Sequence, residues 1–293
     1  MNYRLALKIL IIACFFVLSV SAQITSESEW EMTRPVEPFR VIANVYYVGT
    51  NDVASYLITS DEGHILIDSG FEETVPLIEA SVKKLGFDLK DVKILLNNHE
   101  HYDHCGGLKT LKEKTGAKLY SVREQAEVLA RGGSNDFRFG GKQIFRPVTA
   151  DKQIVHGEVI TLGENKLITI RTPGHTKGAT TWTMRVRDGD RDLEVVFLSS
   201  LSNLDYDLVS NDKYPEIGGD FESTFEILLE LKPDVFLGSH ASFFRMEKKF
   251  EMLKSSPKEN PFIDPEGYTK FVERMREDFR QKLETQKKAA EEK

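Results

Sequence analysis

Residues 99–104 read His-Glu-His-Tyr-Asp-His, so three imidazoles and an aspartate lie within six consecutive positions. Imidazole and carboxylate groups held close together favour a borderline metal such as zinc. His99 and His101 are two residues apart, so at a strand end or turn they project to the same side. Asp103 and His104 follow at once and can point elsewhere. One short segment can therefore supply ligands to two metal ions.

The N-terminus has the pattern of a secretory signal peptide. Arg4 and Lys8 precede an apolar run over residues 9–20, and the short side chains that follow predict cleavage after Ala22. The run is short for a bilayer-spanning helix, so we expect no stable membrane anchor. A lipoprotein signal at Cys14 is disfavoured, because too little apolar sequence separates it from Lys8. We predict an exported, periplasmic protein whose signal peptide covers residues 1–22.

The net charge argues against a nucleic-acid partner, and the cysteine content excludes an intramolecular disulfide in the mature chain. Loss of residues 1–22 removes Arg4 and Lys8 and lowers the net charge from −7 to −9. A chain this acidic lacks the basic surface that phosphate contacts need, so we expect no nucleic-acid partner. Cys14 would leave with the signal, and the remaining Cys105 cannot form an intramolecular disulfide. We expect Cys105 to be a small buried residue rather than a metal donor.

The rest of the chain reads as one α/β domain over residues 39–293, preceded by a polar arm over 23–38. Strands are expected at 39–48, 54–59, 64–68, 92–96, 119–122, 159–162, 167–172, 180–186, 194–198 and 235–238. Helices are expected at 74–85, 107–114, 124–130 and 221–231, with a surface loop over 131–153. From Pro265 onward an apolar stripe predicts a long amphipathic helix on the domain's own surface. Two strand-rich halves, each with helices, suggest an internally duplicated architecture.

Two further histidines stand where a predicted strand releases into a loop. His175 ends the motif Thr-Pro-Gly-His, and His240 ends Gly-Ser-His. Alone, each would more often be structural, but their shared placement with the cluster indicates metal ligands. His64 and His156 lack such a context and are left out of the site. Asp68 ends a strand, and we expect it to hydrogen-bond a metal ligand from behind rather than to serve only as a cap of the strand end.

Together these motifs resemble the metallo-β-lactamase superfamily over roughly residues 39–265. The resemblance implies a four-layer αββα sandwich with mixed sheets and a site for two Zn²⁺ ions at one edge. It also implies two ligand sets: His99, His101 and His175 for the first zinc, and Asp103, His104 and His240 for the second.

The segment after the predicted strand 194–198 resembles one branch of that superfamily. Glyoxalase II and the lactonases resemble one another in a metal-bridging aspartate at this point, and the B1 and B2 β-lactamases use a cysteine. Here the sequence is Ser-Ser-Leu-Ser-Asn over 199–203. Serine at this point resembles subclass B3, as do the runs 178–183 and 260–265. Serines at a strand end commonly cap it or form a turn; the alternative is that Ser200 or Ser202 hydrogen-bonds the substrate carboxylate, with Ser199 in that place if the alignment is off by one.

The expected activity is hydrolysis of β-lactam antibiotics, and hence antibiotic resistance. In such enzymes a metal-bound hydroxide attacks the amide carbonyl without a covalent enzyme intermediate, and Asp103 would orient it as well as bind zinc. One alternative is another two-zinc hydrolase acting on lactones or thioesters. A second alternative is a secreted metal-binding protein without catalysis. The oligomeric state is open, with a monomer favoured.

Overall fold

Two β-sheets face each other at the centre of the molecule in the computed structural model, which describes residues 31–255 and 258–292. The predicted signal peptide, residues 1–22, and the start of the predicted arm lie outside the described residues. Within the described residues no helix is long and apolar enough to cross a bilayer.

Both sheets are mixed. In the first, β4 to β7 run parallel and the remaining pairs antiparallel; in the second, only β11 and β12 run parallel. The first sheet has, in spatial order, β1 (Phe39–Ile42), β2 (Val45–Tyr47), β3 (Tyr56–Ile58), β4 (His64–Ile67), β5 (Val92–Leu96), β6 (Lys118–Val122) and β7 (Lys152–Ile154). The second has β12 (Val235–Gly238), β11 (Arg191–Leu198), β10 (Thr180–Asp188), β9 (Asn165–Arg171) and β8 (Val159–Leu162).

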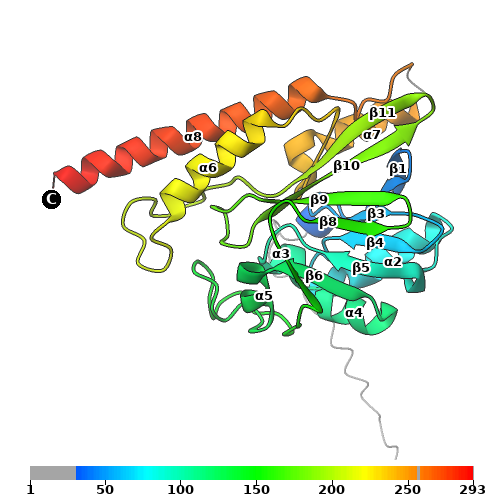
Figure 1. Cartoon of the computed structure of the whole chain (residues 1–293), viewed down its shortest axis with the longest axis horizontal. Coiled ribbons are helices and arrows are strands. Elements are labelled where there is room, and N and C mark those ends of the chain that lie inside the picture. The colour runs from blue at the N-terminus through cyan, green and yellow to red at the C-terminus, as the bar shows by residue number, and fades with distance from the viewer. Residues whose placement is uncertain (1–30, 256–257, 293) are drawn as a thin grey trace, which may run out of the picture.

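Helices cover the outer face of each sheet, which gives the four layers of an αββα sandwich (Figure 1). The outer layers are α2 (Val75–Lys84), α4 (Leu108–Thr115) and α5 (Arg123–Leu129) on the first sheet, and α6 (Ile217–Glu230) and α8 (Pro265–Glu291) on the second. Two further helices are the short α3 (Tyr102–Cys105) and α7 (Met246–Lys254). The predicted fold class is therefore confirmed.

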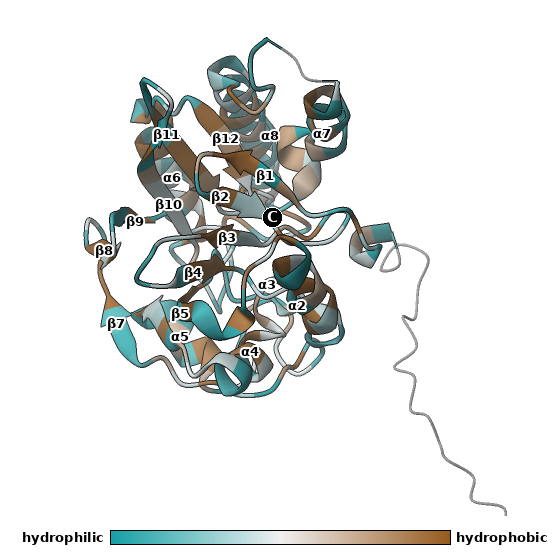
Figure 2. Ribbon diagram, turned by 90° about the vertical axis from the view of Figure 1, so that its right-hand side faces the viewer, coloured by the Kyte–Doolittle hydropathy of each residue, from teal (hydrophilic) through white to brown (hydrophobic). Residues whose placement is uncertain are grey.

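Apolar side chains fill the spaces between the layers. Between the sheets, the Tyr56 and Phe197 rings meet edge to face with 5.1 Å between centroids, and the Tyr56 hydroxyl donates to the Gly238 carbonyl at 2.6 Å. A second cluster, which includes Val82 and Leu95, lies under the helices of the first sheet. Figure 2 shows β3, β4, β11 and β12 in brown, the hydrophobic colour. Burial of this apolar area holds the sheets at fixed positions, and with them the loops at their edge.

Residues 39–48 differ from the single strand predicted for them. They form the hairpin β1–β2, which turns at Ala43, where φ is +44°. The next residue, Asn44, donates from its side-chain amide to the Thr59 carbonyl at 2.6 Å and to Asn165 Oδ1 at 2.8 Å. These contacts come from distant parts of the chain, and no glycine or proline marks the turn in the sequence.

The C-terminal helix follows its apolar stripe. Residues on one side of α8 are buried against α6 and β12, namely Tyr268, Phe271, Val272, Phe279 and Leu283. Helix α7 was not predicted, because its sequence is rich in charges and only two of its side chains are buried. Cys105 is fully buried in the core under the first sheet, as predicted from its size and neighbours.

Candidate metal centre

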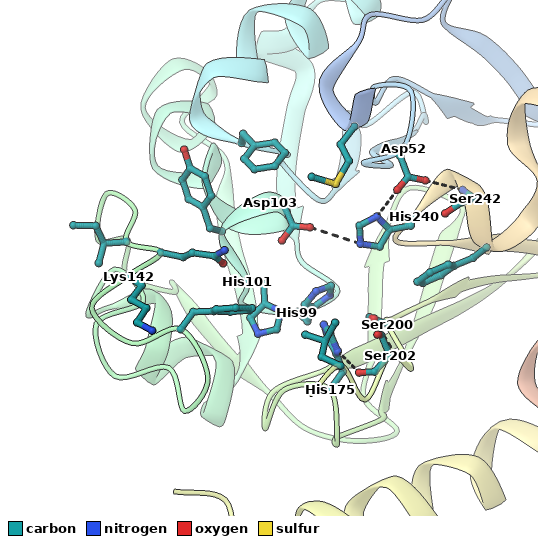
Figure 3. A pocket seen from close by; sticks show the side chains of 18 residues that line it. Asp52, His99, His101, Asp103, Lys142, His175, Ser200, Ser202, His240 and Ser242 are labelled. Carbon is teal, nitrogen blue, oxygen red and sulfur yellow. Dashed lines mark hydrogen bonds and ion pairs between the residues drawn. The ribbon is translucent and has the colours of Figure 1, made fainter. Parts of the chain in front are cut away.

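Four strands end at the same edge of the sandwich, and each delivers site residues there. The buried apolar strand β5 runs directly into residues 99–104, β9 leads to His175, β12 to His240 and β4 to Asp68. The histidines surround a cavity of about 640 Å³ (Figure 3). Its other walls are largely apolar and aromatic: Met32, Phe71, Tyr102, Phe139, Ile144, Leu204 and Phe243.

His99, His101 and His175 form one compact group. One nitrogen from each ring lies within 4.8 Å of the others. Burial lowers the pKa of His99 and of His175 well below the ordinary value, and lowers that of His101 to about 4. All three are therefore neutral at pH 7 and present the lone pairs that a metal requires.

Asp103, His104 and His240 form a second group beside the first. Asp103 Oδ2 lies 3.1 Å from His104 Nε2 and 3.6 Å from His240 Nε2. The two imidazole nitrogens are 3.2 Å apart. Ligands of a tetrahedral zinc with bonds of about 2.0–2.1 Å are about 3.3 Å apart. The three atoms are thus spaced like the ligands of a single ion.

The charges of this second group hold it together when no metal is bound. Burial alone would lower the pKa of His104, but the carboxylates of Asp103 and Asp68 outweigh it and raise the pKa to about 10. Burial would raise the pKa of the Asp103 carboxyl, but His104 and His240 lower it well below its usual range. Because a metal needs the neutral imidazole, binding at this group must release the His104 proton.

The donor atoms fit a transition metal such as zinc. The set combines imidazole nitrogens with a carboxylate, which is the chemistry zinc prefers. His99 Nδ1 and His101 Nε2 are buried and have no hydrogen-bond partner. Such atoms are costly in a folded protein unless a ligand or a small movement satisfies them. A metal centre accounts for why so many imidazoles are gathered at one buried edge.

Several ligand candidates are held from behind by a second polar group. Asp68 Oδ2 lies 3.3 Å from His104 Nδ1, and its Oδ1 accepts from the Asn98 amide at 2.6 Å. Asp68 adopts φ of +62°, a left-handed conformation that aspartate tolerates better than most residues and that aims the carboxylate at the site. His175 Nδ1 lies 2.6 Å from the Ser202 carbonyl oxygen. Such contacts fix the tautomer and the orientation of a ligating imidazole.

Asp52 is a site residue that sequence reasoning missed. Its Oδ2 lies 3.0 Å from His240 Nδ1, and its Oδ1 accepts from the Ser242 amide at 2.9 Å. Burial opposes ionisation, yet the contacts with His240 and Ser242 lower the pKa of Asp52 to about 2. It lies far from every ligand along the chain, in a turn without a motif, so no spacing signal could have found it.

Glu100 is a second missed residue, although it lies inside the cluster. Its side chain is buried and ties the cluster to the loop that carries His175. Glu100 Oε2 accepts from the Thr176 hydroxyl at 2.7 Å and Oε1 accepts from the Gly178 amide at 3.0 Å. Burial outweighs these hydrogen bonds and raises the pKa of Glu100 to about 7. Glu100 lies between two candidate ligands, His99 and His101, and nothing in the sequence shows that its side chain points away from them toward the His175 loop.

The three candidate serines differ in whether they reach the cavity. Ser200 and Ser202 line the cavity, whereas Ser199 does not, and its hydroxyl donates to the Asn98 carbonyl at 3.1 Å. Ser200 Oγ accepts from the Ser202 amide at 3.3 Å, which leaves its own O–H available to a ligand. His64 and His156, which the sequence left out of the site, do not line the cavity.

Comparison with known protein families gives a match that spans the clustered histidines. The sequence profile of the metallo-beta-lactamase superfamily matches residues 48–240, from the end of the first hairpin to the last of these histidines. This chain belongs to the metallo-β-lactamase superfamily. The superfamily is one of metal-dependent hydrolases, and two groups of side chains in this member could hold a metal ion: His99, His101 and His175, and His99, Asp103 and His104.

Solved structures of superfamily members superpose on nearly the whole domain. FEZ-1 metallo-beta-lactamase from Legionella gormanii is 41% identical, with a TM-score of 0.85 and a match covering 87% of this chain and 98% of that one. BJP-1, a subclass B3 metallo-beta-lactamase of Bradyrhizobium japonicum, is 36% identical, with a TM-score of 0.83 over 89% of this chain and 98% of that one. The predicted resemblance to subclass B3 is confirmed.

Curated relatives match over shorter stretches. A hydroxyacylglutathione hydrolase from Bradyrhizobium sp. (strain ORS 278) is 28% identical over 133 residues, which is 43% of this chain and 44% of that protein. A metallo-beta-lactamase type 2 from Bacillus cereus is 37% identical over 79 residues, 26% of this chain and 29% of that protein. The chain thus spans less than half the length of these two relatives, and their named activities differ.

Proposed function

We propose that this superfamily member hydrolyses the amide bond of β-lactam antibiotics, with two zinc ions held by the six clustered ligands. The observation that carries the proposal is the segment after β11, where Ser200 and Ser202 line the cavity. Glyoxalase II and the lactonases resemble one another in a metal-bridging aspartate there. The first aspartate of this chain beyond the serines, Asp205, pairs with Arg138 instead, with 2.5 Å between Oδ2 and Nη2. Similarity to FEZ-1 and BJP-1 over nearly their full lengths supports the same choice.

The division of labour among the chain's residues follows from their positions. Zinc, when bound, supplies a Lewis acid and lowers the pKa of a coordinated water toward neutrality. Asp103, which lines the cavity and keeps its negative charge, accepts a hydrogen bond from the attacking water and orients it toward the carbonyl. The aromatic walls exclude bulk water around the substrate, and the serine hydroxyls donate to its carboxylate. Hydrolysis by water in this way needs no covalent bond to the enzyme.

Thioester hydrolysis is the second candidate, since several curated relatives are hydroxyacylglutathione hydrolases. A panel of substrates separates the two with the zinc-loaded full chain. We expect kcat/KM of at least about 10⁴ M⁻¹s⁻¹ for a chromogenic cephalosporin and a carbapenem, and at least about a hundredfold less for a hydroxyacylglutathione thioester and a lactone. Fast thioester or lactone turnover with no β-lactam turnover would refute the proposal. Stoichiometric zinc with no turnover of any substrate would indicate a metal-binding protein without catalysis.

The cavity offers two candidate binding groups for the substrate carboxylate, the Lys142 ammonium group and the hydroxyls of Ser200 and Ser202. Lys142 is the one positively charged side chain among the described residues that line the cavity, and in Figure 3 it lies across the histidines from Ser200 and Ser202. Lys142 is exposed, so its loss removes a screened interaction of about 0.2–1 kcal/mol, equivalent to a rise in KM of at most about fivefold. Hydrogen bonds to a charged group are worth about 1.5–3 kcal/mol. We therefore expect the double variant S200A/S202A to raise KM at least about tenfold.

The test compares K142A, S200A/S202A and the parent on one cephalosporin at two salt concentrations. The lysine contribution should fall as salt rises, whereas the serine contribution should persist. A larger KM effect for K142A than for the serine variant would place the carboxylate at the lysine side instead.

We propose that this activity takes place in the periplasm after export. N-terminal sequencing of the mature protein tests this proposal, because cleavage of the signal peptide after Ala22 would leave Gln23 as the first residue.

A further inference from the structure

The loop between α5 and β7 carries a buried carboxylate that faces a metal ligand. Asp136 is 6% exposed, and its Oδ2 lies 3.8 Å from His101 Nε2. That nitrogen is buried and has no hydrogen-bond partner. The gap exceeds a hydrogen bond by less than 1 Å, so a small rotation of the imidazole brings the pair into contact.

The same aspartate organises the turn that follows it. Asp136 Oδ1 accepts from the amide of Arg138 at 2.8 Å and from the amide of Phe139. The Asp136 carbonyl accepts from the Gly140 amide at 3.1 Å. Phe139 lines the cavity and its ring packs edge-on against His101, with 4.9 Å between centroids. The Asp136 side chain therefore lies beside a candidate metal ligand and also holds the backbone of a residue that lines the cavity.

We propose that Asp136 is a positioning residue that orients His101 for metal and thereby couples the turn over residues 136–140 to metal occupancy. A neutral imidazole has one donor nitrogen and one acceptor nitrogen. Since a carboxylate can only accept, Asp136 keeps the proton of His101 on Nε2 and leaves Nδ1 to bind the ion. Metal-ligating histidines commonly donate their other N–H in this way. This inference rests on metal binding by His101, which is part of the proposed function.

Coupling between two sites is reciprocal. If the turn holds His101 in the geometry that the metal needs, then bound metal must stabilise the turn by the same free energy. The loop contains three trypsin sites, Arg131, Arg138 and Lys142, and the last of these lines the cavity. Metal occupancy should therefore slow tryptic cleavage of this loop in the unaltered protein.

Three variants separate the roles of Asp136. D136N keeps an oxygen for the turn amides but no longer accepts the His101 proton, whereas D136A loses both functions. D205N is the matched control, because it removes one negative charge from the pair that anchors the same loop through Arg138 and leaves Asp136 in place. Circular dichroism and thermal unfolding check that each variant folds.

Zinc affinity is measured by competition with a chromophoric chelator, and the site geometry from the visible spectrum of the cobalt-substituted protein. We expect D136N to weaken the tighter zinc site by about 10–100-fold and to alter the cobalt spectrum, and D205N to change affinity less than about threefold. Saturating zinc should slow loop cleavage at least about fivefold in the parent protein and much less in D136A. The inference would be overturned if D136N had the same zinc affinity as the parent, or if zinc did not change the rate of tryptic cleavage of the parent loop. Zinc affinity and loop cleavage are both measured without a substrate. A protein that fails to hydrolyse β-lactams could therefore still confirm or refute the role of Asp136.

Discussion

Replacement of Asp103 by alanine should lower kcat/KM for β-lactams by about 10²–10⁴-fold, the range associated with loss of a positioned acid or base. Asp103 is the only carboxylate among the six candidate ligands, and its Oδ2 lies within 3.6 Å of the Nε2 atoms of both His104 and His240. Its removal therefore deprives one metal of a ligand and the attacking water of its orienting acceptor. The measurement is steady-state hydrolysis of a chromogenic cephalosporin at saturating zinc.

The fold should survive this change. The Asp103 side chain is 22% exposed toward the cavity, and alanine suits the short helix α3 in which it lies. The matched control is D61A, which removes an exposed carboxylate in the turn before β4 and should leave turnover unchanged. Near-normal turnover of a folded, zinc-loaded D103A protein would show that the assigned mechanism is wrong.

Removal of metal by a strong chelator should abolish hydrolysis, and addition of zinc should restore it. The same treatment should lower the thermal midpoint. A ligand present at a thousand times its Kd stabilises the native state by about 4 kcal/mol, and each kcal/mol shifts the midpoint of a domain this large by about 2–4 °C. We expect a decrease on the order of 10 °C. Elemental analysis of the restored protein should give two zinc ions per chain.

The stability and activity losses have a common structural cause. Without metal, the neutral imidazoles of His99, His101 and His175 remain buried beside one another with no ion to accept their lone pairs, which costs free energy. Variant D103A under the same chelator serves as the control, because its smaller metal contribution should give a smaller decrease in the midpoint. Activity that resists exhaustive dialysis against chelator would contradict a metal-dependent reaction.

The sequence could predict those parts of the molecule that have a local signal. The apolar run that ends before the histidine cluster predicts β5 with the bounds that the structure has, Val92–Leu96, because a short buried strand flanked by polar residues needs no tertiary information. The apolar stripe after Pro265 likewise predicts α8. Histidines in three separate motifs could be assembled into one site because each follows a strand, and strand ends in such sandwiches meet at one edge.

The residues behind the ligands could not be predicted in this way. Asp52 and Asp136 approach His240 and His101 only through the packing of distant loops, and an isolated aspartate in a polar turn has many ordinary uses. The turn at Ala43 could not be predicted for the same reason, since the residue that follows it, Asn44, makes its hydrogen bonds with the distant residues Thr59 and Asn165. Local pattern specifies the elements and the ligands, whereas tertiary structure determines what orients them.

The candidate ligands come from both sheets, and this has a consequence for how long the folded state persists. Residues 99–104 follow a strand of the first sheet, while His175 and His240 follow strands of the second. A bound ion therefore acts as a cross-link between the two halves of a chain whose one described cysteine is free. Because the halves cannot separate until those bonds break, the rate of unfolding should depend on metal even under conditions where the equilibrium hardly changes. Zinc supply would then set the protein's lifetime in the presence of proteases as well as its capacity for catalysis.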